Sequence, residues 1–221
     1  MQKRSWTKVV AVAAALLVVI AGVFYTIKSK GKRPPVSGMN PAFAEYISSY
    51  TSGVINSGAT IRIGFAQDMV DSSSVGSFTS VKLFAFSPSV PGNAIWVDRR
   101  TVEFRPDSRL ISGQIYEGSF KLSKVLDVPQ DLETFEYSFQ VIPQNFDVTV
   151  TNIKPYVLTE LTKVKVEGLI STADFADPQQ VEKVISAKQE GNNLKVGWSH
   201  SGDNREHTFT IEEATRKSEA S

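Results

Sequence analysis

Residues 95–105 read IWVDRRTVEFR, and this stretch decides the fold class. Two short runs of β-forming residues are separated by Asp98-Arg99-Arg100, a link of hairpin length. In the second run, residues 101–105, apolar and polar side chains alternate, which is the period of a strand with one buried face. We therefore predict a β-hairpin at this point of the chain.

The same alternation continues on both sides of this hairpin. Residues 61–65 place three apolar side chains on one face of a strand and Arg62 on the other. Turn residues such as Pro106-Asp107 and Ser112-Gly113 separate the runs at intervals of about 8–12 residues. The further predicted strands are residues 81–86, 116–122 and 135–141. This pattern predicts an all-β fold, with an immunoglobulin-like β-sandwich over residues 40–143.

A second immunoglobulin-like module is predicted over residues 144–221. One helix is expected in it, because Asp177-Pro178-Gln179-Gln180 offers an N-cap, a proline at the first helical position and a glutamine at the third. We expect this helix to span residues 178–187. The predicted strands are residues 146–150, 164–166, 194–198 and 207–211.

The two modules resemble each other weakly, with matches at offsets of 102 to 106 residues. Because the first module has two strands after Phe104, we expect the second module to be incomplete within these 221 residues. Its apolar side chains Val196, Trp198 and Phe209 would then lack cover. The matched positions are Ile61 with Val164, Asp71 with Asp177, Trp96 with Trp198, and Phe104 with Phe209.

The N-terminus sets the predicted compartment. Residues 9–27 carry no charge and would form a helix roughly 28 Å long, enough to cross the hydrocarbon core of a bilayer. We predict a transmembrane anchor, with a cleaved signal peptide as the alternative. Residues 1–8 would be a basic cytoplasmic end and residues 28–39 a stalk. Both interpretations export the body to the periplasmic or extracellular side of the cell envelope.

Composition excludes several classes of function. The chain has no cysteine, which rules out disulfides, thiolate metal sites, a cysteine nucleophile and a lipid-modified N-terminal cysteine. Residues 1–33 hold seven of the 24 basic residues and no acidic one, so the rest of the chain has 17 basic and 23 acidic residues. An acidic body argues against a nucleic acid partner.

A family resemblance rests on the first module. After the run FSPSVPG (86–92) come Trp96, then TVEFRP (101–106), then Leu110, Gly113 and Tyr116. With Asn40-Pro41-Ala42-Phe43 and the strand at 134–141, this pattern resembles the N-terminal end of bacterial alpha-2-macroglobulins of the Bacteroidetes type.

The resemblance covers about residues 38–221 and implies a function. It suggests the membrane-anchored N-terminal scaffold of a broad-spectrum protease inhibitor, whose proteases would be bound by parts of the protein outside these residues. The bait region and the Cys-x-x-Gln thioester of that family are not in this sequence, and a membrane helix would replace its lipoprotein cysteine. The alternative is a cell-surface adhesion or glycan-binding module on the same sandwich, which would present Trp96, Trp198 and Tyr116 as an exposed aromatic platform.

Polar clusters in the sequence predict no enzyme. Ser199, His200, Asp203 and His207 lie within nine residues, but a catalytic triad needs geometry rather than proximity, and this segment looks like a hairpin turn. We therefore predict no catalytic, cofactor-binding or metal-binding residue and no cofactor.

Two further groups of charged residues were weighed as ligand sites. Asp68 and Asp71 could join a calcium site, although calcium wants six to eight oxygen ligands and a solvated loop is the simpler interpretation. Arg99-Arg100 could bind an anionic partner, although solvated hairpin charges are the simpler interpretation.

Overall fold

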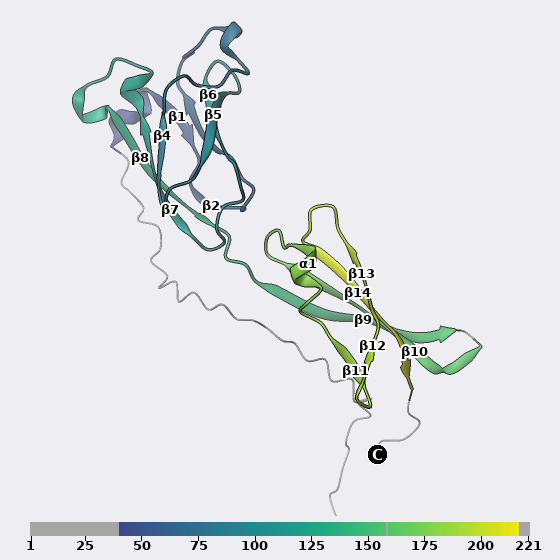
Figure 1. Ribbon diagram of the computed structural model, residues 1–221. Coiled ribbons are helices and arrows are strands. Elements are labelled where there is room, and N and C mark those ends of the chain that lie inside the picture. The colour runs from purple at the N-terminus through teal and green to yellow at the C-terminus, as the bar shows by residue number, and fades with distance from the viewer. Residues whose placement is uncertain (1–39, 158, 217–221) are drawn as a thin grey trace, which may run out of the picture. The chain divides into compact units, whose positions relative to one another are not determined.

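The computed structural model describes residues 40–157 and 159–216, and the described chain consists mainly of β-strands joined by short helical turns (Figure 1). The predicted all-β fold is confirmed. The chain divides into two compact units between Gln144 and Asn145, called here the first and the second unit. The predicted anchor at 9–27 lies outside the described residues, as do the basic end and the stalk. Within the described ranges, no helix has the length and apolarity needed to cross a bilayer.

The first unit contains two four-stranded sheets. All neighbouring strands are antiparallel except β2 and β8, which are parallel. The first sheet contains, in spatial order, Ile47–Tyr50 (β1), Ile61–Phe65 (β3), Thr101–Pro106 (β6) and Gly92–Trp96 (β5). The second sheet contains Gly53–Ile55 (β2), Thr134–Val141 (β8), Ile115–Lys121 (β7) and Phe84–Ser87 (β4). Helical turns lie at Pro41–Glu45 (η1), Ser72–Ser74 (η2), Leu122–Lys124 (η3) and Gln130–Leu132 (η4).

One aromatic-rich core joins the two sheets into a β-sandwich. Phe65 of the first sheet lies edge-on to Phe120 of the second, with ring centroids 5.8 Å apart. Phe104 and Phe86 also meet across the sheets, with tilted rings whose centroids are 4.9 Å apart. Because side chains alternate along each strand, every second residue of β3, β6, β7 and β8 points into this core.

The predicted hairpin at 95–105 is confirmed as β5–β6, and Asp98 closes its tip by accepting a hydrogen bond from the Arg100 amide at 2.7 Å. The strand predicted at 81–86 begins only at Phe84. The segment after Asn40 contains η1 followed by β1, and β1 pairs with β3.

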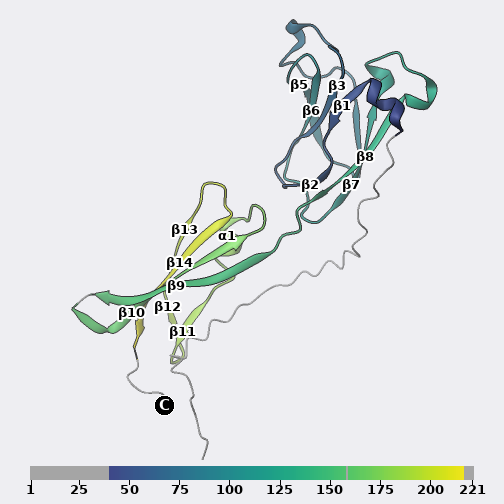
Figure 2. The same ribbon diagram turned by 180° about the vertical axis from the view of Figure 1, so that it is seen from behind.

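The second unit is built on a single four-stranded antiparallel sheet (Figures 1 and 2). Between its second and third strands lie a one-turn helix and a β-hairpin. The sheet contains, in spatial order, Val196–His200 (β13), Glu206–Thr215 (β14), Glu160–Thr172 (β10) and Phe146–Val157 (β9). The inserted elements are Pro178–Val181 (α1), Ala187–Gln189 (β11) and Asn192–Leu194 (β12).

This sheet repeats the strand order of the first sheet of the first unit. When strands are numbered along the chain within each sheet, both sheets run first, second, fourth, third. A short helical turn, η2 or α1, follows the second strand in each case and begins after an aspartate, Asp71 or Asp177.

The helix predicted at 178–187 is wrong in length. Asp177 does cap it, since its side chain accepts a hydrogen bond from the Gln179 amide at 3.0 Å, but the helix ends at Val181. Residues 182–184 form a turn, and Ala187 instead pairs with Leu194 in the β11–β12 hairpin. This hairpin turns at Glu190 and Gly191, whose φ angles of 51° and 83° suit a two-residue hairpin turn.

The core of the second unit is smaller and covers only part of its sheet. Phe209 is buried and Val196 and Trp198 pack against the same cluster, contrary to the expectation that they lack cover. Instead, the exposed apolar side chains lie along β9. The buried residues of this core are Val166, Ile170, Val181, Ile185, Ala187, Phe209 and Ile211.

Candidate functional site

Two histidines of the second unit form a pair, of which one is fully buried and the other partly exposed. The antiparallel pairing of β13 with β14 sets His200 directly opposite His207, and their Nδ1 atoms are 2.8 Å apart. Both belong to the inward rows of their strands, with Trp198 beside His200 and Phe209 beside His207. His207 is completely buried. The site therefore holds two titratable rings inside an apolar cluster.

The contacts around the pair assign the position of each proton. Glu182 is the residue that follows α1, and its Oε1 lies 3.2 Å from Nε2 of His200. Because a carboxylate only accepts, Nε2 of His200 carries a proton, and its Nδ1 then accepts from Nδ1–H of His207. Nε2 of His207 is left bare, and it is buried without a hydrogen-bond partner in the described part of the chain.

This arrangement resists full protonation. If both rings carried a proton on Nδ1, two N–H groups would face each other across the 2.8 Å contact. Burial and the neighbouring charge of His200 accordingly lower the pKa of His207 below its usual 6.5. The Asn204 backbone and the Asp203 carboxylate act in the opposite direction but more weakly.

The Ser/His/Asp set does not assemble into a triad. Ser199 is exposed and lies between Trp198 and His200 on β13, so it faces the opposite side of the sheet from the histidines. Asp203 instead closes the hairpin turn, accepting hydrogen bonds from the Ser201 hydroxyl at 2.6 Å and the Arg205 amide at 3.2 Å.

None of the three aromatic rings considered as a glycan-binding platform is fully exposed. Trp96 is buried beside Phe65, with ring centroids 5.8 Å apart. Tyr116 is buried, and its hydroxyl accepts a hydrogen bond from the Ile111 amide at 3.2 Å. Trp198 is half-buried between His200 and Phe209. Neither Trp96 nor Tyr116 offers an exposed stacking surface.

Asp68 and Arg99-Arg100, weighed as two separate sites, belong to one contact. Asp68 forms ion pairs with Arg99 at 2.7 Å and with Arg100 at 2.5 Å, which fixes the tip of the β5–β6 hairpin. The hydrogen bond from Arg100 lowers the pKa of Asp68. Asp71 precedes η2 without a side-chain cap bond. No group of three or more potential metal ligands occurs among residues 40–157 and 159–216.

The sequence analysis did not identify a buried carboxylate on β6. Glu103 is only 2% exposed, and it accepts hydrogen bonds from Arg62 at 2.6 Å, Arg105 at 2.7 Å and Thr60 at 3.1 Å. Burial acts to raise the pKa of Glu103, but these hydrogen bonds outweigh it and the net pKa lies below the usual 4.5. The group ties β3 to β6 on the outer face of the first sheet.

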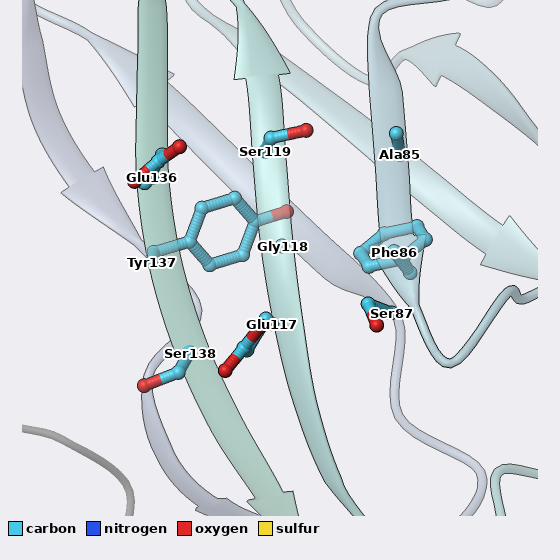
Figure 3. Close-up of a pocket in the computed structure, with 9 residues that line it drawn as sticks. All are labelled: Ala85, Phe86, Ser87, Glu117, Gly118, Ser119, Glu136, Tyr137 and Ser138. Carbon is cyan, nitrogen blue, oxygen red and sulfur yellow. The ribbon is translucent and has the colours of Figure 1, made fainter.

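A cavity of about 450 Å³ lies along β4, β7 and β8 (Figure 3). The Tyr137 ring crosses β7 at Gly118, where a side chain would collide with it, and the Tyr137 hydroxyl is buried without a partner in the described residues. Burial raises the pKa of Tyr137, so the phenol stays protonated. Around it stand small side chains and two exposed carboxylates, Glu117 and Glu136.

Comparisons with known proteins place the chain in no family. No family of known proteins matches the sequence, and no curated protein matches it. An L,D-transpeptidase of Mycobacterium tuberculosis has 11% identity and a TM-score of 0.33 over 72% of this chain and 61% of that one. L,D-transpeptidase 3 of the same organism has 10% identity and a TM-score of 0.32 over 72% and 60%. The N-terminal part of the bacterial S-layer protein SbsC has 14% identity and a TM-score of 0.29 over 71% and 36%.

These solved structures give no guidance on activity. The chain spans 61% and 60% of the length of the two transpeptidases, at identities where similarity bears on fold alone. TM-scores near 0.3 carry no argument about the fold of either unit.

Proposed function

We propose that this chain is the membrane-anchored N-terminal scaffold of an alpha-2-macroglobulin-like protease inhibitor in the bacterial cell envelope. In this proposal both units are immunoglobulin-like modules in tandem. One observation carries it: the same strand order, first, second, fourth, third, in both units, with a helical turn after the second strand. Because a fold does not by itself imply a function, this observation supports the modular architecture of the proposed scaffold.

The main residues that carry the family resemblance contribute to the fold of the first unit. Trp96, Phe104, Leu110 and Tyr116 are buried, and Glu103 lies beneath two arginines. A pattern composed of such residues describes how a module folds. It therefore supports the modular architecture more strongly than the inhibitor activity, which depends on segments outside these residues.

The anchor and the compartment follow from residues 9–27, which supply the uncharged stretch of membrane-spanning length. For the adhesion alternative, no observation among the described residues provides an exposed aromatic platform. We therefore keep the scaffold as the proposed function.

Two experiments test the proposal. The coding sequence after codon 221 should contain further modules of this pattern and a Cys-x-x-Gln thioester, and a stop codon with no such continuation would count against it. The purified chain should also leave a panel of endoproteases uninhibited on large substrates, because the bait is absent. Inhibition by these 221 residues alone would contradict the assignment.

A further inference from the structure

The edge strand β9 is unusual among the edge strands of this protein. It contains 12 residues, whereas the other sheet edges, β1, β2, β4, β5 and β13, contain three to five. A typical strand has about 5–6 residues, and natural proteins keep exposed edges short because an edge offers unpaired backbone groups. A long edge strand therefore indicates a place where another strand pairs.

The apolar side chains of β9 share one face. Val148 pairs with Ile170 and Ile153 with Val166, both buried residues of β10, so this row faces the core side of the sheet. Of the side chains in this row, Val148 packs against the core of the second unit, and the others lie outside the cover formed by α1 and the β11–β12 hairpin. Its exposed members are Phe146 (42%), Val150 (56%), Ile153 (64%) and Val157 (46%).

A bulge makes this row complementary to itself. The pairing with β10 skips Thr151, because Val150 lies opposite Gly168 while Asn152 lies opposite Glu167. As a result Val150 and Ile153, three positions apart, point to the same face, which an unbroken strand would not allow. The row can therefore meet a second copy of itself antiparallel, with the two-fold axis between Thr151 and Asn152.

We propose that β9 pairs with β9 of a second copy of this chain in that register. Val150 then lies opposite Ile153 of the other copy and Phe146 opposite Val157, so all four exposed apolar side chains face one another. Such an isologous interface closes on itself as a dimer. The charged residues Asp147 and Lys154 stand opposite positions 156 and 149, which carry no charge.

The charge of Lys154 is also directed away from the apolar row. Its Nζ lies 2.8 Å from Glu167 on the outer face of its own sheet. Pro155 removes one hydrogen-bond donor per copy, so the pairing rests on apolar contacts with a shortened ladder. An interface of one strand per copy belongs to the small, weak class.

The register makes a sharp test available because the chain contains no cysteine. Full-length Val150→Cys and Ile153→Cys proteins are oxidised separately and as a mixture, in detergent. Directly opposite residues have Cβ atoms close enough for a disulfide. We expect the mixed 150–153 disulfide to exceed either same-residue disulfide at least tenfold. The matched control is Thr149→Cys mixed with Ile153→Cys, which places one thiol on the opposite face.

Sedimentation of the full chain gives the second measurement. Ile153→Asp should raise the dimer dissociation constant at least tenfold, whereas Thr149→Asp, which places a carboxylate opposite Lys154 on the other face, should not weaken the dimer. A dimer held by residues 1–39 would persist in Ile153→Asp and would give no selective 150–153 link. That result overturns the proposal, as would a monomer at all concentrations, which would assign the row to a different polypeptide.

Discussion

The two units share one sheet topology and differ in what covers the sheet. In the first unit a second sheet closes the core, which contains 19 buried apolar residues. In the second unit one helical turn and a small hairpin provide the cover, and the core contains seven. The same strand order thus occurs with a closed core and with a partly open one. The two units differ in the number of apolar side chains that pack against this sheet.

The largest expected difference between the two units is in their resistance to local unfolding. Each fully buried apolar side chain contributes about 1.5–3 kcal/mol, so the first unit should open far less often. Backbone amides of β7 and β8 should exchange with deuterium at least about 100-fold more slowly than those of β10 and β14. Limited proteolysis should cut first near Asn145 or between residues 199 and 206. Equal protection of both units would show that the smaller core suffices.

A substitution at the buried carboxylate should affect only the first unit. Glu103→Gln removes the charge that Arg62 and Arg105 bind, at an expected cost of about 1.5–2 kcal/mol because both guanidinium groups are half exposed. Chemical denaturation with separate probes in each unit measures this. Glu136→Gln, an exposed carboxylate on β8, is the control and should cost nothing measurable.

The same carboxylate predicts an acid limit for the first unit. The pKa of Glu103 is lowered in the folded state, so its contribution is complete above about pH 4.5 and is lost as the pH falls through its folded value. Glu103→Gln should abolish this part of the pH dependence. An unchanged acid transition in the variant would assign it to other carboxylates.

The second unit should weaken at milder acidity. The pKa of His207 is lowered, so the unfolded chain takes up its proton first, and stability is complete above about pH 6.5 and falls below it. One excluded proton gives a slope of about 1.4 kcal/mol per pH unit at most. Thermal unfolding between pH 7.5 and 5 measures this, and His207→Phe should flatten the curve. A slope in the first unit over this range would contradict the assignment.

The smallest effect is expected at the helical turn of the second unit. Asp177→Ala removes the acceptor of the Gln179 amide and should cost about 0.5–1 kcal/mol, since the cap serves a helix of four residues. Asp71→Ala at the matching position of the first unit should cost less, because Asp71 makes no cap bond. Equal losses in the two variants would mean that the hydrogen bond from the Gln179 amide to Asp177 contributes nothing.

Strands with regular alternation were predictable, and strands formed by tertiary pairing were not. Residues 61–65, 101–105 and 135–141 alternate cleanly and form β3, β6 and β8. The three residues of β2 contain no pattern, and β9 extends through Pro155 because pairing with β10 outweighs local preference. The helix after Asp177 was overestimated because residues 182–184 form a turn and Ala187 belongs to the β11–β12 hairpin.

The polar contacts were harder to predict than the strands. The alternation Trp198, His200 and His207, Phe209 already placed both histidines in apolar rows, and that pattern could have indicated the histidine pair. Glu103 gave no such indication. A charge at an outward strand position is normally solvated, and only the register of β3 against β6 brings Arg62 over it.

Trp198 stacks on His200, so its fluorescence can report on the second unit separately from the first. The two rings lie nearly parallel, at 8°, with centroids 6.1 Å apart. Indole emission is sensitive to the groups in contact with the ring. The fluorescence of Trp198 should therefore report the opening of the cluster around His200, while that of Trp96, buried beside Phe65, reports on the first unit.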